Sequence, residues 1–185
     1  MPLAPPTDRE PVQTRAIEVF SYRRTDGQWD VEGHLTDTSA YAFENEYRGT
    51  IDPGVPIHDM WLRLTLDKDI NITAVDAAMD GTPYAICPGV ASAFQKLKGE
   101  KIGRGWNRRI RELLGGAEGC IHMVDLLRPV GTIGFKTVKR ESAQQAKPST
   151  EKSDDMPYQI NNCHAMASDG DLVKERWPHL YTGAS

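Results

Sequence analysis

The sequence predicts an α+β fold, in which a curved antiparallel β-sheet from the N-terminal half is packed by about three helices from the C-terminal half. Up to about residue 75, apolar and polar residues alternate with the two-residue period of β-strands. After Pro83, apolar residues recur every three or four positions, which is the period of amphipathic helices. A run of strands followed by a run of helices is typical of α+β domains.

Two β-hairpins account for the predicted sheet. Their turns are expected at Thr25-Asp26-Gly27 and Asp67-Lys68-Asp69, because these residue types favour turns. The flanking strands are expected at residues 17–22, 29–35, 57–66 and 70–75. The polar connection 42–56 between the hairpins is long enough to predict a functional loop or rim, with His58 where this loop meets a strand.

Helices are expected in the second half, each indicated by an apolar stripe. The first stripe is Val90, Phe94 and Leu97, and the second is Trp106, Ile110, Leu113 and Leu114. A third helix is expected to begin near Gly119 and to stop before Pro129. Residues 131–138 are expected as a last strand or as an extension packed on the helices.

The chain is expected to hold a single catalytic-type domain at residues 14–140. Residues 1–13, with their prolines, predict a flexible lead. Residues 141–185 predict a polar linker and a C-terminal tail, because Ser, Gln, Lys and Asp bury too little apolar surface to order a segment. Apolar residues return at 177–181, so this segment is expected either to dock on the domain or on a second subunit, as in a homodimer, or to form a disordered tail.

Composition excludes several functional classes. The formal net charge of -4 and the sequence pI near 5.7 argue against a nucleic-acid-binding protein, which normally carries a basic face. No signal peptide and no apolar run of membrane-spanning length is found, so a cytoplasmic protein without a membrane partner is expected. The 3 cysteines lack regular spacing and predict no structural disulfide.

His58 is the first candidate for proton-transfer chemistry, because an imidazole exchanges protons near neutral pH. Its neighbour Asp59 is expected on the opposite face of the strand and therefore not to orient the His58 ring. The alternative interpretation is a half-buried histidine that bonds only to the backbone.

Cys120 and His122 form the second candidate setting. If Gly119 begins the helix, Cys120 lies near the positive end of that helix, where the pKa of a thiol is lowered. In that case His122 faces a cleft between this helix and the sheet. A buried structural thiol is the alternative. Tyr84 is expected to direct its phenolic proton toward a substrate oxygen.

A zinc site is a further interpretation, built from His58, Cys87, Cys120 and His122, which are all zinc-ligand types. No Cys-x-x-Cys or His-Glu-x-x-His motif supports it. The sequence therefore favours a site that needs neither a metal nor another cofactor.

An ordered series of short motifs spans the same region. It consists of Tyr22–Gly33, Asp37, Ile57–Met60, Pro83-Tyr84, Cys87-Pro88, Gly103–Trp106 and Gly119–His122. Through this series, over about residues 15–128, the sequence resembles the bacterial DUF2889 family, although Ile121 stands where the family usually has threonine. The family name denotes a domain of unknown function. The resemblance implies, through relatives in bacteria that degrade aromatic compounds, a lyase that releases a small aldehyde from a hydroxylated aromatic.

We therefore expect a cofactor-independent carbon–carbon lyase that acts on a hydroxylated, lignin-derived aromatic compound and releases formaldehyde. The expected catalytic residues are His58, His122 and Tyr84, with one histidine as the general base and the backbone of 119–122 stabilising negative charge. The expected substrate-binding residues are Asp37, Asp59, Cys87, Trp106 and Cys120. A zinc-dependent hydrolase and a non-catalytic ligand-binding domain are the alternatives.

Overall fold

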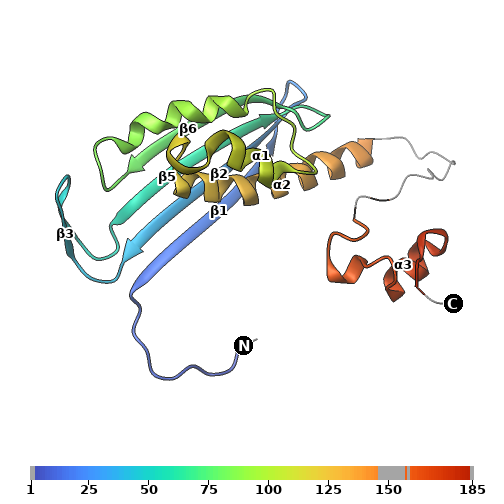
Figure 1. Cartoon of the computed structure of the whole chain (residues 1–185), viewed down its shortest axis with the longest axis horizontal. Coiled ribbons are helices and arrows are strands. Elements are labelled where there is room, and N and C mark those ends of the chain that lie inside the picture. Colours follow the sequence, from blue (N-terminus) through green and yellow to red (C-terminus); the bar gives the residue numbers. More distant parts are fainter. Residues whose placement is uncertain (1–2, 146–156, 158, 184–185) are drawn as a thin grey trace. The chain divides into compact units, whose positions relative to one another are not determined.

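The computed structural model describes residues 3–145, 157 and 159–183. The chain divides into two compact units, Met1–Gln145 and Ala146–Ser185. The first unit contains the sheet, the long helices and the candidate site residues, so it is described first (Figure 1).

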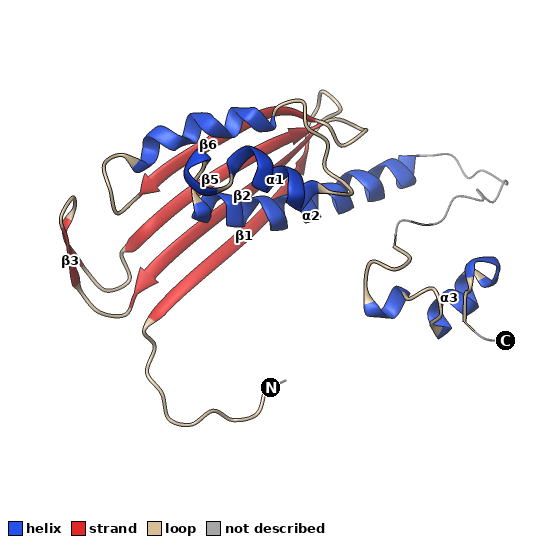
Figure 2. Ribbon diagram, viewed as in Figure 1, coloured by secondary structure: helices blue, strands red, loops and turns tan. Residues whose placement is uncertain are grey.

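A four-stranded antiparallel sheet forms one layer of the first unit (Figure 2). In sheet order its strands are β1 (Gln13–Arg23), β2 (Trp29–Ser39), β5 (Pro56–Leu66) and β6 (Ile72–Gly81). Both predicted hairpins are present, and β1 begins earlier than the expected residue 17. The predicted α+β class is therefore confirmed.

The connection between the hairpins contains a small second sheet. It consists of β3 (Phe43–Asn45) and β4 (Gly49–Ile51), which pair antiparallel. The Asn45 side chain shapes this turn, because its Oδ1 accepts hydrogen bonds from the backbone N–H groups of Tyr47 and Arg48. Its Nδ2 donates to the carbonyl of Pro83, 3.1 Å away, and so ties the β3–β4 hairpin to the segment after β6.

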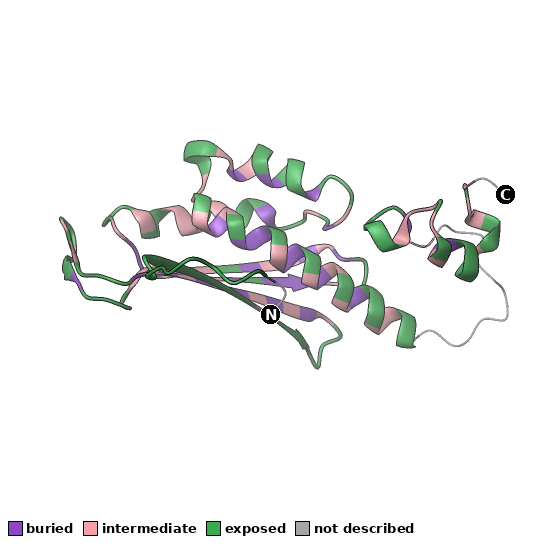
Figure 3. Ribbon diagram, turned by 90° about the horizontal axis from the view of Figure 1, so that it is seen from below, coloured by how far each residue is buried: buried purple, intermediate pink, exposed green. Residues whose placement is uncertain are grey.

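Helices cover one face of the four-stranded sheet, as Figure 3 shows from the side. They are the 3₁₀ helix η1 (Cys87–Leu97), α1 (Trp106–Leu114), the short η2 (Gly116–Glu118) and α2 (Ile121–Gln145). Alternate residues of β2, among them Val31 and Leu35, are fully buried against this layer. The predicted stripes also face the core, since Phe94, Ile110 and Leu114 are buried.

Helix α2 corrects the prediction that a helix stops before Pro129 and that a strand or extension follows. It continues through Pro129 to Gln145. An internal proline costs a helix about 3 kcal/mol or more, but burying a valine contributes about 1.5–3 kcal/mol. Both Val130 and Val138 are fully buried, so the apolar face that continues beyond the proline offsets its cost.

The second unit is a short helical segment. It contains η3 (His164–Met166), α3 (Asp171–Arg176) and η4 (Pro178–Leu180), and the Lys174 ammonium lies 5.2 Å from the centre of the Tyr181 ring. The first residues of the predicted linker, 141–145, belong to helix α2, and its part at 146–156 lies outside the described residues.

In the described part of the chain, no helix combines the length and apolar character needed to cross a membrane.

Candidate functional site

Strand alternation and cross-strand register bring Asp37 and His58 together. These residues are direct partners on β2 and β5, on the face of the sheet that the helices cover. The register shifts immediately after Asp37, which marks a bulge at this point of β2. Bulges re-aim side chains near the end of a strand. The register between β2 and β5, which belong to different hairpins, therefore builds the first half of the site.

Asp37 is a buried carboxylate, with only 1% of its side chain exposed. Arg15, its cross-strand partner on β1, holds both carboxylate oxygens: Nε lies 2.7 Å from Oδ1 and Nη2 lies 2.8 Å from Oδ2. The third nitrogen, Nη1, donates to Asp125 Oδ2 on α2 at 2.8 Å. A buried charge needs such a partner, and bidentate Arg–carboxylate pairs are among the strongest available.

His58 contacts the same carboxylate. Its Nδ1 lies 3.0 Å from Asp37 Oδ2. Because an ionised carboxylate only accepts hydrogen bonds, the neutral His58 ring carries its proton on Nδ1 and leaves the lone pair of Nε2 unprotonated. This is the tautomer that a general base requires.

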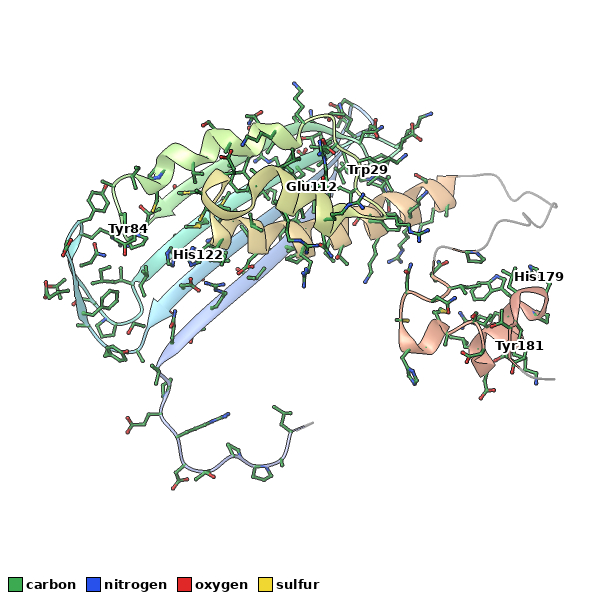
Figure 4. All side chains as sticks on the ribbon, viewed as in Figure 1. Trp29, Tyr84, Glu112, His122, His179 and Tyr181 are labelled. Atoms are coloured by element: carbon green, nitrogen blue, oxygen red, sulfur yellow. The ribbon has the colours of Figure 1, made fainter. Side chains whose placement is uncertain are left out.

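Helix α2 contributes His122 and, just before its first residue, Cys120. The Cys120 carbonyl accepts the hydrogen bond of the Val124 N–H at 2.8 Å, so Cys120 stands at the N-terminal cap position. The His122 ring stacks on His58 with 3.7 Å between ring centres, and its Nε2 lies 3.8 Å from Asp37 Oδ2. Cys120 Sγ lies 3.8 Å from His122 Nδ1. Figure 4 places His122 toward the end of the sheet near the β3–β4 hairpin.

The electrostatics keep the carboxylate charged and the histidines neutral. Burial raises the pKa of Asp37, but the hydrogen bonds and charge of Arg15, with the two histidines, outweigh it, and the net pKa is lowered. Burial lowers the pKa of His58 despite the opposing influence of Asp37. Burial also lowers the pKa of His122, with further contributions from the charges of His58 and Arg15. The two rings are therefore bases rather than cations at neutral pH.

Four of the residues expected at the site come together: Asp37, His58, Cys120 and His122. Asp59 lies on the opposite face of the sheet, as its strand position predicts, and there its Oδ1 is 2.7 Å from His34 Nε2. The His34 ring stacks on Trp61 with 3.9 Å between ring centres. Asp59, which was expected to bind substrate, is therefore placed away from the Asp37–His58–His122 cluster.

The other expected residues are also placed apart from this cluster. Trp106 is buried in the core, where its Nε1 donates to the Leu127 carbonyl at 3.2 Å, so its ring packs α1 against α2. The side chain of Tyr84 is largely exposed, and Figure 4 shows it at the same end of the sheet as His122. Cys87 begins η1 and is half-buried. Roles for Tyr84 and Cys87 stay predictions.

Arg15 is the functional residue that sequence reasoning missed. It lies before the predicted first strand, so no periodicity marked it. Extending that strand and fixing its register with β2 would have placed Arg15 beside Asp37. The structure shows Asp37 buried, and a buried carboxylate needs a cation such as Arg15 beside it.

The fold and the cluster define this protein as an α+β domain in which a buried aspartate and two half-buried histidines lie together at one end of an antiparallel sheet. Residues 13–136, more than half of the chain, match the family model described as "Protein of unknown function (DUF2889)". The chain belongs to this family. No curated protein and no solved structure matches the chain.

Proposed function

We propose that this protein is a cofactor-independent carbon–carbon lyase that releases formaldehyde from a hydroxylated aromatic compound, with His58 as the general base. The observation that carries the proposal is the 3.0 Å contact between His58 Nδ1 and the buried Asp37 carboxylate. A carboxylate that orients a histidine and fixes its tautomer is the arrangement that general-base catalysis uses.

The reaction breaks one C–C bond and asks the protein only to move protons. The Nε2 of His58 takes the proton from the hydroxyl of a hydroxymethyl substituent on the substrate. The O–H electron pair becomes the second C–O bond of formaldehyde, and the electrons of the breaking C–C bond pass to the carbon that carried the substituent. That carbon then takes up a proton. The products are formaldehyde and a compound with a new C–H bond, so no oxidant, reductant or water is consumed.

The neighbouring groups support this chemistry. His122 stacks on His58 and lies near Cys120, so it is a second group able to move a proton at the same place. The backbone N–H groups at the start of α2 carry the partial positive charge of a helix N-terminus, which stabilises the negative charge that develops on the hydroxymethyl oxygen while its proton passes to His58. We include a cytoplasmic setting in the proposal, supported by the free state of Cys87, Cys120 and Cys163.

A metal-dependent hydrolase is the second candidate, and one observation favours it. One ligand atom each from Asp37, His58 and His122 lies within 4.8 Å of the other two, and this group replaces the expected set that included Cys87 and Cys120. Two histidines and a carboxylate can bind a transition metal. However, Arg15 already occupies both oxygens of Asp37, and its positive charge would repel a divalent cation at this place. We therefore rank the lyase first.

The experiment that tests the proposal is a substrate screen with protein treated with a chelator and checked by elemental analysis. The substrates are phenolic dimers that bear a hydroxymethyl group, and formaldehyde is followed as the product. Formaldehyde release by metal-free protein, equal in moles to the aromatic product, is the expected result. Activity that requires added zinc would replace the lyase by the metal-dependent candidate. Ligand binding without turnover across the screen would favour a non-catalytic domain.

A further inference from the structure

A cavity of about 400 Å³ lies beside the candidate site, in the size range of small-molecule pockets. It is formed by the β3–β4 hairpin, the end of β6 and the start of η1. Its lining residues are Tyr47, Arg48, Met79, Asp80, Thr82 and Pro88. None of them belongs to the Asp37–His58–His122 cluster, so the cavity is a distinct feature of the same end of the sheet.

Strand pairing and one backbone contact place the cavity beside the residues of β5 that flank His58. Met79 of β6 lies opposite Met60 of β5, two residues after His58, and Gly81 lies opposite Asp59. Arg48, on the hairpin side of the cavity, is fixed to the start of β5. Its Nη1 donates to the carbonyl of Pro56 at 2.8 Å and approaches that of Ile57 at 3.4 Å. These carbonyls immediately precede His58. The charge of Arg48 also contributes to lowering the pKa of His58, after burial and other neighbours.

Arg48 brings a positive charge without a negative partner. Among the residues that the structure describes, no carboxylate lies within 4.0 Å of its guanidinium nitrogens, whereas Arg15 and Arg109 are each paired with acidic groups. Its side chain is half-buried and one nitrogen is held by backbone carbonyls. A fixed guanidinium at a cavity wall is suited to a carboxylate or phenolate oxygen.

The rest of the lining suits an aromatic ring. Tyr47 offers an aromatic ring, Met79 a polarisable thioether and Pro88 an apolar ring. The Thr82 hydroxyl is already engaged, because it donates to the Tyr84 carbonyl at 3.2 Å. Asp80 adds a carboxylate that repels a second anionic group and accepts a hydrogen bond from a hydroxyl.

We propose that this cavity binds the ring of an aromatic anion, with its carboxylate or phenolate oxygen paired to Arg48. Binding of the anion does not depend on the proposed function; only the identification of this ligand as the substrate rests on it. If the ligand is the substrate, the bound ring presents its hydroxymethyl substituent to His58. Arg48 is then a specificity-determining residue, which favours anionic over neutral aromatics.

Calorimetric titration of the full chain with unreactive probes tests the proposal. The probes are 4-methoxybenzoate for the carboxylate, 4-nitrophenolate for the phenolate and methyl 4-methoxybenzoate as the neutral compound. We expect an anion to bind in preference to the ester, and the stronger anion identifies the group that Arg48 recognises. A charge-assisted hydrogen bond predicts that Arg48→Met weakens anion binding about 10- to 100-fold and leaves ester binding nearly unchanged. The matched control Arg104→Met, at an exposed arginine, should change neither affinity.

Two further variants keep the test decisive. Tyr47→Ala leaves the bonds from Arg48 to the Pro56 and Ile57 carbonyls in place, and we expect it to weaken binding of the anions and the ester alike. His58→Ala should retain anion binding, so a failed lyase assay leaves this inference testable by itself. The inference is overturned if neither anion binds in preference to the ester, or if folded Arg48→Met and Tyr47→Ala proteins bind as the wild type does.

Discussion

At the scale of single residues, Asp37 organises the hydrogen bonds and the charge of the site. Its carboxylate is buried, held on both oxygens by Arg15 and in contact with His58. An ionised group in such a place orders the donors around it, because each lost hydrogen bond leaves a polar group without a partner. The same carboxylate therefore fixes the fold of the site and the tautomer of the proposed base.

Replacing Asp37 should damage both properties. Asp37→Asn keeps the size of the side chain but removes the charge that Arg15 and His58 require, so we expect formaldehyde release to fall roughly 10²- to 10⁴-fold. The free energy of unfolding in urea should drop by about 1–3 kcal/mol. Asp59→Asn is the matched control, because Asp59 also bonds a histidine, but on the open face of the sheet. An Asp37→Asn protein with full activity would contradict the role of this pair.

The pH dependence of the reaction follows from the lowered pKa of His58. In the proposed mechanism neutral imidazole is the active form, so kcat/KM should rise with pH and reach its plateau by neutral pH. Burial lowers this pKa, so the midpoint of the rise should lie below the ordinary histidine value of about 6.5. The charge of Asp37 raises the pKa of His58, so its removal in Asp37→Asn should move the midpoint to still lower pH. A midpoint above the ordinary value in the wild type would contradict a buried neutral base.

At the scale of elements, strands could be predicted better than helix ends. The strands of both hairpins alternate over enough residues to show their period, whereas β3 and β4 are too short to show any. Pro129 is a helix stop by local rules, yet tertiary burial of Val130 and Val138 overrides it. The C-terminal end of α2 is therefore decided by tertiary packing, which cannot be read from the local sequence pattern.

The contact between β2 and α2 positions His122 and depends on a glycine. A side chain carbon added at Gly33 would come within 2.6 Å of Val130 Cγ2, and a valine side chain has little freedom to move. We expect Gly33→Ala to lower the free energy of unfolding by about 1–2 kcal/mol, because overpacking outweighs the gain in strand propensity. It should also reduce activity by displacing α2. Gly89→Ala, which meets open space, is the control for urea unfolding. Equal stability of both variants would show that the two elements are not tightly packed here.

At the scale of the whole molecule, the sequence predicted the fold class and part of the site. Asp37, His58 and the Cys120–His122 pair come from three separate segments of the sequence. They were singled out by residue chemistry and by the resemblance to DUF2889, and the fold brings them together. Arg15 and the pairing of Asp59 with His34 were missed, because both depend on cross-strand register, which the local pattern of a single strand does not contain. Register follows from the alignment of whole hairpins rather than from local composition.

The two faces of the sheet provide an internal control for the central claim. Each face carries a histidine bonded to an aspartate, His58 with Asp37 under the helices and His34 with Asp59 on the opposite side. The two pairs lie on the same strands, β2 and β5. Only the pair under the helices stacks with a second histidine and lies beside the start of α2. We therefore expect catalysis at the His58–Asp37 pair and none at the His34–Asp59 pair.

The most direct test is the rate of formaldehyde release by metal-free His58→Ala and His34→Ala proteins, compared with the wild type. Loss of a positioned general base predicts that His58→Ala is slower by roughly 10²- to 10⁴-fold, while His34→Ala stays within a few-fold of the wild type. Circular dichroism spectra should show that both variants fold. Wild-type rates from a folded His58→Ala protein, or an equal loss in both variants, would contradict the assignment of His58 as the base.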